Sequence, residues 1–518
     1  MSRRLCLILT VAAVLAVSGT ARADITDDDV RLLGLMFMSQ YVPYSEQVDA
    51  DPVVKEIAAS AQQFRRSSDV DNAEKYRALI KGCTIILTGT WGEAQEVGTI
   101  LDMRLPAKLY GPGDTVNPRV FPLYERAEPL DGRYAVRVKL VDADGKTIGK
   151  PATKHIEALE INEFVLPIPA DIVPGRYAVD YTIHPDDGGD KQTSLNARRS
   201  IFVMSEARSR LETLADKLAR LREKSIGDKG TRQKLAIDTI GWYLEIYNRA
   251  LHEDVPGAYS GHPICMVAPL ARLGYTFERM DFTNELALAE ELADALLAGG
   301  DPLRTRTGDM RLAYTSPVDG ELVPFRIFVP EQRSSSSCSL VIALHGAGGD
   351  ENSFMDRYDG LYRKNARERG YIAVAVNGRG PYGGYRGDSG QDTLDVLDLV
   401  QHVYPIDKKR TYLTGHSMGG VGTTLIGFDN AERFAALAVI AGFGRPAQLV
   451  KAKDMPILIA QGDQDALVPV TAARGFYKTA QRLEMPHVKY IELEGVDHLE
   501  IATLAMNDIF DWFEKFSK

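Results

Sequence analysis

The sequence predicts an α/β fold for its last two-fifths, preceded by a β-sandwich and a helical connector. From about residue 308, short apolar runs alternate with helical segments, a pattern typical of a mostly parallel sheet covered by helices. Between 81 and 204, short strands are separated by turns rich in Gly, Asp and Pro, as in a β-sandwich. Residues 205–305 instead place apolar side chains at helical spacing.

The first 23 residues have the pattern of a secretory signal peptide. Two arginines precede the apolar run Leu5–Val17, and the small-x-small sequence Ala21-Arg22-Ala23 follows it. A transmembrane anchor is the alternative, but the apolar run is too short to span a bilayer. We therefore expect a mature chain that starts at Asp24, does not insert into a membrane after cleavage, and is exported to the periplasm or the cell exterior.

Two segments are predicted between the signal peptide and the connector. Residues 24–80 are expected to be helical, because Tyr76, Leu79 and Ile80 follow helical spacing. Residues 81–204 are expected to form an immunoglobulin-like β-sandwich. Its strand candidates are Cys83–Leu87, Arg133–Val141, Glu163–Ile168 and Arg176–Ile183.

The connector, residues 205–305, carries a stripe of leucines at positions 211, 214, 218 and 221. We interpret this stripe as a packing face rather than a partner-binding surface. Two further helices are predicted over Lys234–Leu251 and Glu285–Leu297, and the second is expected to end at Gly299-Gly300.

The last domain, residues 306–518, is predicted to begin with a hairpin around Val318-Asp319-Gly320. Helical segments separate most of the later strands, so we expect them to be parallel. The strand candidates are Met310–Thr315, Leu322–Val329, Leu340–Leu344, Ile372–Val376, Thr411–Leu413, Leu437–Ile440, Ile457–Ala460 and Val488–Leu493.

The bulk composition argues against some partners and sites. The 518 residues carry a formal net charge of −10, which argues against nucleic acid or an anionic membrane surface as the main partner. Outside the signal peptide, Cys83, Cys265 and Cys338 lie far apart and lack C-x-x-C spacing. We expect buried structural thiols rather than zinc ligands, with one disulfide at most.

A nucleophile is indicated by Gly415-His416-Ser417-Met418-Gly419, a G-x-S-x-G motif that follows an apolar run and precedes a helix-compatible one. A serine at this spacing lies on a sharp strand-to-helix turn that lifts its hydroxyl above the sheet. Small residues are needed two positions before and after it, because the strand and helix backbones pass close together. The motif predicts a serine hydrolase with Ser417 as the nucleophile.

The base and the acid must follow the serine in chain order in this arrangement. Only His487 and His498 follow Ser417, and His498 comes after a predicted strand, at the sheet edge that holds the serine. We therefore predict His498 as the base. Asp465, in the loop after Ile457–Ala460, is the acid candidate because it could orient the imidazole and stabilise the imidazolium. Asp463 on the same loop is its rival, and Asp497 is expected to cap its own loop.

An oxyanion hole requires backbone donors close to the nucleophile. The first is expected to be the N–H of Met418, directly after Ser417. The second is predicted to be the N–H of Ala347, in the sequence Leu344-His-Gly-Ala-Gly-Gly349 that follows a strand about seventy residues before the serine. A plain glycine-rich turn is the alternative for this segment.

These motifs resemble the α/β-hydrolase superfamily over about residues 308–518. The sequences Leu-His-Gly-Ala-Gly-Gly, Tyr412-Leu-Thr-Gly-His-Ser-Met-Gly-Gly and Asp-x-x-Val-Pro are similar to those of feruloyl esterases and polyhydroxybutyrate depolymerases, and of the prolyl-oligopeptidase catalytic domain. Gln461 departs from the pattern, since relatives often have His there. The first 300 residues show no propeller-blade repeat, which argues against the oligopeptidase alternative.

Gly387-Asp388-Ser389-Gly390 is similar to the nucleophile loop of trypsin-like proteases, but the fold context differs, so we do not expect Ser389 to react. We place it in a loop before a helix at Thr393–His402. Tyr382, Tyr385 and Arg386 in the same loop could line a substrate pocket or be solvated.

The sequence thus predicts a carboxylic ester hydrolase that acts through an acyl-enzyme on Ser417, with no metal or organic cofactor. About a dozen residues separate the strand that ends near Gly442 from the strand at Ile457, which leaves little room for a lid and suits bulky or polymer-linked esters. A peptidase and a catalytically silent binding protein are the alternatives. The acyl group, the alcohol and the oligomeric state are left open.

Overall fold

The computed structural model describes residues 52–64, 71–89, 91–122, 129–186, 195–223, 230–251, 280–331, 337–380 and 382–518. The chain divides into two compact units. Unit 1 draws on residues 1–211 and 245–283, and unit 2 on residues 212–244 and 284–518. The predicted signal peptide lies outside the described residues, as does Cys265.

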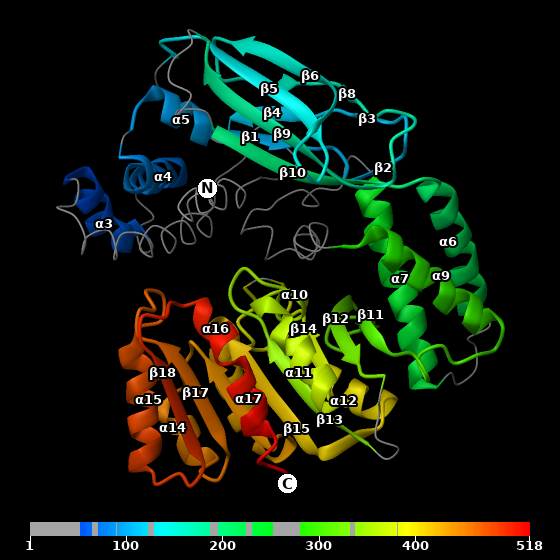
Figure 1. Ribbon diagram of the computed structural model, residues 1–518, viewed down its shortest axis with the longest axis vertical. Coiled ribbons are helices and arrows are strands. Elements are labelled where there is room, and N and C mark those ends of the chain that lie inside the picture. The colour runs from blue at the N-terminus through cyan, green and yellow to red at the C-terminus, as the bar shows by residue number, and fades with distance from the viewer. Residues whose placement is uncertain are drawn as a thin grey trace. The chain divides into compact units, whose positions relative to one another are not determined.

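Unit 1 contains three helices and several short sheets among its described residues before the connector (Figure 1). One sheet has five strands in the order β2-β10-β9-β5-β6, another has three in the order β1-β4-β7, and β3 pairs with β8. The elements are α3 (Pro52–Phe64), α4 (Asn72–Thr88), α5 (Glu93–Ile100), β1 (Leu101–Arg104), β2 (Leu109–Tyr110), β3 (Thr115–Val116), β4 (Arg119–Pro122), β5 (Tyr134–Val141), β6 (Thr147–Ile156), β7 (Asn162–Glu163), β8 (Leu166–Pro167), β9 (Gly175–Pro185) and β10 (Leu195–Val203).

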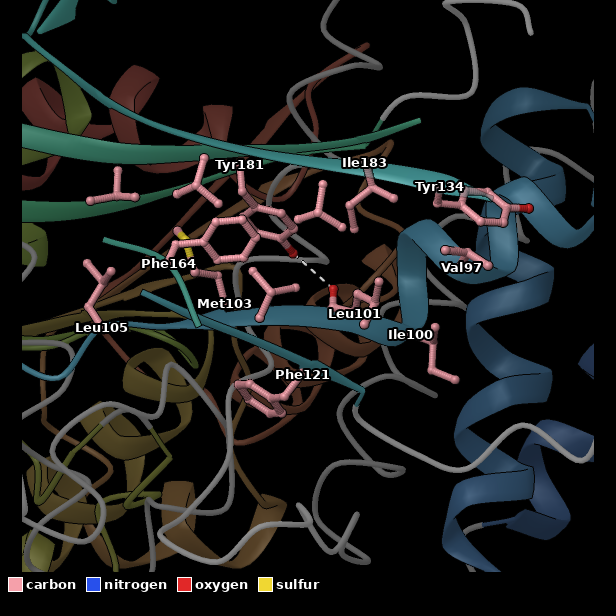
Figure 2. Packing of buried hydrophobic residues seen from close by; sticks show 14 of the residues in the cluster. Val97, Ile100, Leu101, Met103, Leu105, Phe121, Tyr134, Phe164, Tyr181 and Ile183 are labelled. Carbon is pink, nitrogen blue, oxygen red and sulfur yellow. Dashed lines mark hydrogen bonds between the residues drawn. The ribbon is translucent and has the colours of Figure 1, made fainter. Parts of the chain in front are cut away.

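Buried side chains from the five-stranded and three-stranded sheets share one hydrophobic cluster. Met103 on β1 and Phe121 on β4 belong to it, as do Tyr134 on β5 and Tyr181 on β9 (Figure 2). The Tyr181 hydroxyl donates a 2.9 Å hydrogen bond to the Leu101 carbonyl, so a strand of one sheet is bonded to a strand of the other. The alternating apolar positions seen in the sequence therefore face a common core.

Two strand predictions in this unit are wrong. Glu163–Ile168 does not form one strand, because its residues are divided between β7 and β8, which belong to different sheets. The structure places Cys83–Leu87 in the last turns of α4, which ends at Gly89 with a left-handed φ of 79°. The apolar run Cys-Thr-Ile-Ile-Leu suggested a strand, but the helical spacing of Tyr76, Leu79 and Ile80 continues to the buried Cys83. Packing of that face outweighs the strand propensity of its β-branched residues.

The helices predicted for the connector are present in the structure. They are α6 (Ala207–Glu223), α7 (Thr231–Leu251) and α9 (Phe282–Leu297), and α9 ends as expected, with Gly299 in a left-handed conformation. The leucine stripe at 211, 214, 218 and 221 is buried, as a packing face should be. The residues of α7 are divided between the two units at position 244.

Unit 2 is built on an eight-stranded sheet in the order β11-β12-β14-β13-β15-β16-β17-β18 (Figure 1). The β11–β12 hairpin is antiparallel, β12 runs antiparallel to β14, and the other neighbours are parallel. The strands are β11 (Gly308–Thr315), β12 (Leu322–Val329), β13 (Cys338–Leu344), β14 (Ile372–Val376), β15 (Ile406–His416), β16 (Ala436–Ile440), β17 (Ile457–Gly462) and β18 (Val488–Leu493). Every strand predicted for this domain is confirmed.

Helices supply the apolar surfaces that bury the sheet. One hydrophobic cluster joins sheet residues such as Val341 and Ala438 to α10, α11, α16 and α17. Helices α12, α13 and α15 contact β15, β16 and β17. Their bounds are α10 (Ser353–Asp356), the 3-10 turn η3 (Tyr358–Gly360), α11 (Leu361–Arg369), α12 (Asp388–Val403), α13 (Met418–Asp429), the 3-10 turn η4 (Ala431–Arg433), α14 (Pro446–Lys451), α15 (Val470–Arg482), α16 (Glu500–Leu504) and α17 (Met506–Phe513).

Two further observations bear on the sequence predictions. Cys83 and Cys338 are both buried free thiols, as expected. In the described part of the chain, no helix has both the length and the apolar character needed to cross a membrane.

Candidate active site

The parallel strands align their carboxyl ends at one edge of the unit 2 sheet. Leu344 on β13 pairs with Gly415 on β15, and His416 pairs with Ile440 on β16. The loops that carry the predicted oxyanion donor and the predicted nucleophile therefore start side by side. The loops after β17 and β18 start at the paired residues Gly462 and Leu493.

Ser417 occupies the sharp turn between β15 and α13. Its backbone has φ 58° and ψ −116°, a conformation that L-residues rarely adopt. The turn is fixed by a 2.8 Å hydrogen bond from the Ser417 N–H to the Ile440 carbonyl. Such strain persists only where surrounding contacts impose it, and it is frequent at functional sites.

The glycines around Ser417 permit this turn. A Cβ on Gly415 would lie 2.2 Å from the carbonyl oxygen of Gly419, and a Cβ on Gly419 would lie 2.0 Å from that of Leu344. Any side chain at either position would collide with backbone atoms. The close approach of strand and helix expected from the motif is thus present in the structure.

His498 and Asp465 meet at the same edge. Nδ1 of His498 lies 2.7 Å from Oδ2 of Asp465, and both side chains are nearly fully buried. A carboxylate can only accept, so Nδ1 carries the hydrogen and the lone pair of the neutral ring is on Nε2. This is the tautomer that a general base for a serine hydroxyl requires.

The Asp465 carboxylate is held by more than the histidine. Its Oδ1 accepts from the backbone N–H groups of Leu467 and Val468 at 2.9 and 2.8 Å, and its Oδ2 accepts from Nε2 of Gln461 at 2.8 Å. Burial alone would raise the pKa of Asp465, but the hydrogen bonds from His498 and the two amides outweigh it, and the pKa lies below its ordinary value. Gln461, noted in the sequence only as a departure from relatives, thus binds the acid candidate.

The two other aspartates in these loops, Asp463 and Asp497, accept hydrogen bonds from backbone N–H groups. Asp463 accepts a 2.7 Å hydrogen bond from the Gly495 N–H at an exposed position. Asp497 accepts from the N–H groups of Leu499 and Glu500, both at 2.8 Å, so it caps its own loop as expected. The structure brings Asp465, and not its rival, to His498.

The predicted oxyanion segment passes close to Ser417. A Cβ on Gly346 would lie 3.3 Å from the Cβ of Ser417, so a side chain at position 346 would crowd the serine. In the described structure, the N–H groups of Ala347 and Met418 donate to no backbone carbonyl. Met418 is also the first residue of α13, where helix N–H groups lack intrahelical partners and favour negative charge.

In the part of the chain that the structure describes, Ser417 and the predicted base His498 are not joined by a hydrogen bond. Among the hydrogen bonds of the described residues, none joins the Ser417 hydroxyl to His498. Such bonds are often long in ligand-free sites and tighten when substrate binds. The ring centroid of His416, the residue before Ser417 in the chain, lies 4.8 Å from that of His498.

His416 is the main residue that sequence reasoning missed. Its Nε2 lies 2.8 Å from the backbone carbonyl of His498, and its Nδ1 lies 3.2 Å from the hydroxyl of Tyr358. Only 3% of the residue is exposed. The residue occupies a variable position of the motif, and the contact with Tyr358 spans 58 residues, so spacing alone carried no signal for it.

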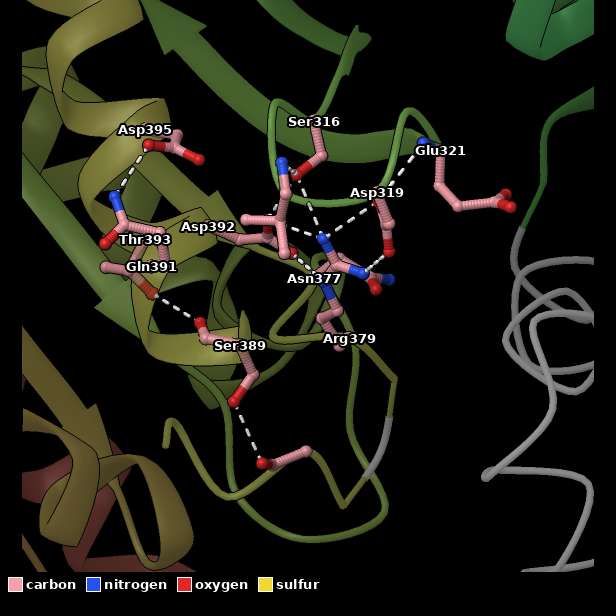
Figure 3. A network of polar contacts seen from close by, with 12 residues as sticks. Ser316, Asp319, Glu321, Asn377, Arg379, Ser389, Gln391, Asp392, Thr393 and Asp395 are labelled. Atoms are coloured by element: carbon pink, nitrogen blue, oxygen red, sulfur yellow. Dashed lines mark hydrogen bonds and ion pairs between the residues drawn. The ribbon is translucent and has the colours of Figure 1, made fainter. Parts of the chain in front are cut away.

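The loop after β14 is held in place by the contacts of a buried arginine. Arg379, with a φ of 58°, pairs with Asp392 on α12 and with Asp319 in the β11–β12 turn, and it donates a 2.9 Å hydrogen bond to Ser316 (Figure 3). The same loop carries Tyr385, whose buried hydroxyl donates to the His345 carbonyl. The network therefore fixes a loop that packs against the oxyanion segment.

Ser389 lies where the loop after β14 meets the start of α12 (Figure 3). The structure places it in the first turn of α12, so the expectation of a loop before a helix at Thr393–His402 is wrong. Its hydroxyl is 2.9 Å from the Gly383 carbonyl and accepts from the Arg386 N–H at 3.0 Å. The residue is buried, and its hydroxyl joins the loop to the first turn of α12. Of the aromatic residues in the loop, Tyr382 is half-buried, and its hydroxyl would lie 3.5 Å from a Cβ on Gly348.

Comparison with known proteins shows partial similarity to several enzymes. No family model matches the chain. A "dihydrolipoyllysine-residue acetyltransferase component of acetoin cleaving system" from Pseudomonas putida is 31% identical over 174 residues, and "feruloyl esterase B" from Talaromyces funiculosus is 27% identical over 127. The matches cover 32% and 22% of this chain, but only 45% and 35% of those relatives. A solved structure described as a thermostable esterase is 16% identical, with a TM-score of 0.36, over 80% of this chain and 99% of that one.

Proposed function

The homologues of this chain include esterases and related hydrolases, feruloyl esterase B and an S-formylglutathione hydrolase among them, and on that premise we propose that it hydrolyses carboxylic esters through an acyl-enzyme on Ser417. The observation that carries the proposal is the 2.7 Å contact between His498 and Asp465, at the same sheet edge as the strained Ser417. In this proposal His498 is the base, Asp465 orients it, and the N–H groups of Ala347 and Met418 bind the oxyanion.

In the acylation step, the tautomer of His498 leaves Nε2 free to accept the proton of the Ser417 hydroxyl. Oγ of Ser417 attacks the ester carbonyl carbon while Nε2 of His498 removes its proton. The carbonyl oxygen becomes an oxyanion at the N-terminus of α13, where two donors and the helix dipole favour negative charge. The tetrahedral species then expels the alkoxide, which takes the proton from His498, and the acyl group stays on Ser417.

Deacylation repeats these steps with water as the nucleophile. Nε2 of His498 takes a proton from the water as its oxygen attacks the acyl carbonyl carbon. Collapse of the second tetrahedral species returns that proton to Oγ of Ser417 and releases the carboxylic acid. Asp465 stabilises the imidazolium in both halves and is not itself protonated.

The site's surroundings support a substrate with a large apolar group. Leu467, Leu499 and Phe443 are 51%, 61% and 41% exposed, and each follows a strand end in the loops that carry or adjoin the proposed catalytic residues. Only the short helix α14 lies between β16 and β17, where a lid could otherwise be inserted. These features support a bulky or polymer-linked ester, in keeping with the aromatic ester substrates implied by the name of the feruloyl esterase relative.

The direct test is a substrate panel on the full chain. Feruloyl, acetyl and longer p-nitrophenyl esters and peptide anilides should be compared, each with wild-type protein and with Ser417→Ala. We expect ester turnover that Ser417→Ala abolishes, with little cleavage of anilides. Preferential cleavage of anilides would support the peptidase alternative, and no turnover of any substrate would support a silent binding protein.

We further propose that the sheets of unit 1 form the immunoglobulin-like sandwich predicted for residues 81–204. The support is the hydrophobic cluster shared by the two larger sheets, together with the hydrogen bond from Tyr181 to Leu101. Export is likewise a proposal, supported by the composition of residues 3–23. N-terminal sequencing of protein recovered outside the cytoplasm should begin at Asp24, and an intact N-terminus would contradict it.

A further inference from the structure

His416 makes two directional contacts at opposite sides of its ring. Nε2 faces the backbone carbonyl oxygen of His498 at 2.8 Å, and Nδ1 faces the Tyr358 hydroxyl at 3.2 Å. A carbonyl oxygen only accepts, so Nε2 must carry the hydrogen. In the neutral ring Nδ1 then has a lone pair, and the Tyr358 O–H is the group that donates to it. The two contacts together fix one tautomer of His416.

The surroundings of His416 keep it neutral. The charged and titratable groups around it are His498, Asp465, Arg357 and Tyr358. Burial, together with the charges of His498 and Arg357, lowers the pKa of His416 to about 3, although the His498 carbonyl and Asp465 act in the opposite direction. A second histidine thus lies beside the proposed base without titrating in the range where that base must work.

Tyr358 reaches His416 from a strained turn. Tyr358, Asp359 and Gly360 have consecutive positive φ values of 55°, 54° and 68°. For the two non-glycine residues this conformation is unfavourable and persists only where other contacts impose it. The ring of Tyr358 packs edge-on against Phe354 at 5.1 Å, and η3 contacts α16, the helix that follows His498. The strain therefore falls in the segment that presents the Tyr358 hydroxyl.

We propose that His416 and Tyr358 are positioning residues for the base: His416 holds the main chain of His498, and the Tyr358 hydroxyl holds the ring of His416 in place. The inference rests on the proposed function, since it assigns the pair a purpose only if His498 is the base. Asp465 restrains the ring of His498 and His416 restrains its backbone, so the base is fixed at two points. Displacement of a catalytic group by about 1 Å can cost on the order of a hundredfold in rate.

The tautomer can be measured without any activity. In full-length protein with ¹⁵N-labelled histidine, two-bond ¹H–¹⁵N correlation spectra distinguish the two neutral tautomers and the imidazolium. The His416 signals are assigned by their loss in His416→Gln. We expect the Nε2–H form at every pH between about 5 and 9. Titration of His416 within this range, or the Nδ1–H form, would overturn the proposal.

The kinetic test compares Tyr358→Phe with a matched control. Tyr362→Phe also removes a buried hydroxyl, bonded to the Val341 and Val374 carbonyls, from a ring that packs edge-on against Phe354 at 5.2 Å. We expect Tyr358→Phe to lower kcat by about tenfold with KM unchanged. Tyr362→Phe should lower thermal stability only. Equal kcat values for the two variants would show that Tyr358 does not position the base.

A pair of substitutions at position 416 tests the hydrogen bond that His416 donates to the His498 carbonyl. His416→Phe removes the N–H and should lower kcat by about tenfold or more, whereas the amide of His416→Gln can still donate to the His498 carbonyl and should restore most of it. Equal loss in the two variants would contradict a role for the hydrogen bond. If the wild-type chain hydrolyses no ester, the proposed function fails, while the spectra still decide the tautomer.

Discussion

Gly462 and Val496 lie so close that a Cβ on the glycine would be 2.1 Å from the carbonyl oxygen of Val496. The Gln464 N–H donates to the same carbonyl at 3.1 Å. Gly462 ends β17 and precedes the loop of Asp465, whereas Val496 lies in the loop that carries His498. This backbone contact brings the loop of Asp465 against the loop of His498, so the hydrogen bond between these two side chains depends on the absence of a side chain at position 462.

Gly462→Ala should therefore separate the two loops. We expect a loss of stability of several kcal/mol from overpacking against backbone and a near-complete loss of esterase activity. Gly475→Ala is the matched control, because Gly475 lies on α15 with no atom within 4 Å of its would-be Cβ. That change should leave activity intact and stabilise by about 0.5–1 kcal/mol. Wild-type turnover in Gly462→Ala, measured beside urea unfolding, would contradict the role of this contact.

Asp465→Asn should keep the fold and lower kcat by about three to four orders of magnitude, as expected when the base is held in the wrong tautomer. Asp463→Asn serves as the control, since its carboxylate binds only the exposed Gly495 N–H among the described hydrogen bonds. Steady-state kinetics with an activated ester give both values. A larger effect from Asp463→Asn would mean that the carboxylates have been assigned the wrong way round.

Stability should fall as the pH is lowered, because of His416. Its pKa is about 3 in the folded chain and about 6.5 when unfolded, so between these values the unfolded state binds the extra proton. The stabilisation is complete above about pH 6.5 and decreases by at most about 1.4 kcal/mol per pH unit below it. His416→Gln should have a shallower slope in urea unfolding between about pH 5 and 7. Equal slopes for the two proteins would show that His416 does not remain neutral.

A fragment of residues 305–518 holds every proposed catalytic residue but should fold poorly. Arg311 on β11 is buried, with Glu285 of α9 at 2.6 Å and Glu351 at 3.1 Å, and the Tyr243 hydroxyl of α7 donates to its backbone carbonyl. The fragment lacks Glu285 and Tyr243, and breaking a buried ion pair costs about 3–5 kcal/mol. Size-exclusion chromatography and thermal unfolding should show aggregation or a lower Tm. A monomeric fragment with the Tm of the full chain would contradict this.

The structural features that depend on local residue pattern and on strand order could be predicted from the sequence. The glycines around Ser417 indicated the turn, and the placement of His498 and Asp465 after successive strands predicted that they would meet at one sheet edge. Parallel strands align their carboxyl ends, so chain order alone was enough for this part of the candidate site.

Contacts set by packing between distant loops could not be predicted in this way. The hydrogen bond from Tyr358 to His416 depends on three successive residues with a left-handed backbone conformation. Of these three, only Gly360 is a residue type that suggests this conformation. The Cys83–Leu87 error has a related cause, because burial of one helical face decided between two local structures that the residues alone would permit. In the same way, the early start of α12 at Asp388 follows Gly387, whose φ is 54°, a conformation that the residue pattern did not indicate.

The most direct test of the account is the site of covalent labelling by a fluorophosphonate. Full-length wild type, Ser417→Ala and Ser389→Ala should be treated with the probe, digested, and mapped by mass spectrometry. We predict modification on the peptide that contains Ser417, unchanged labelling in Ser389→Ala, and none in Ser417→Ala. Labelling at Ser389, or labelling that persists in Ser417→Ala, would contradict the assignment of Ser417 as the nucleophile.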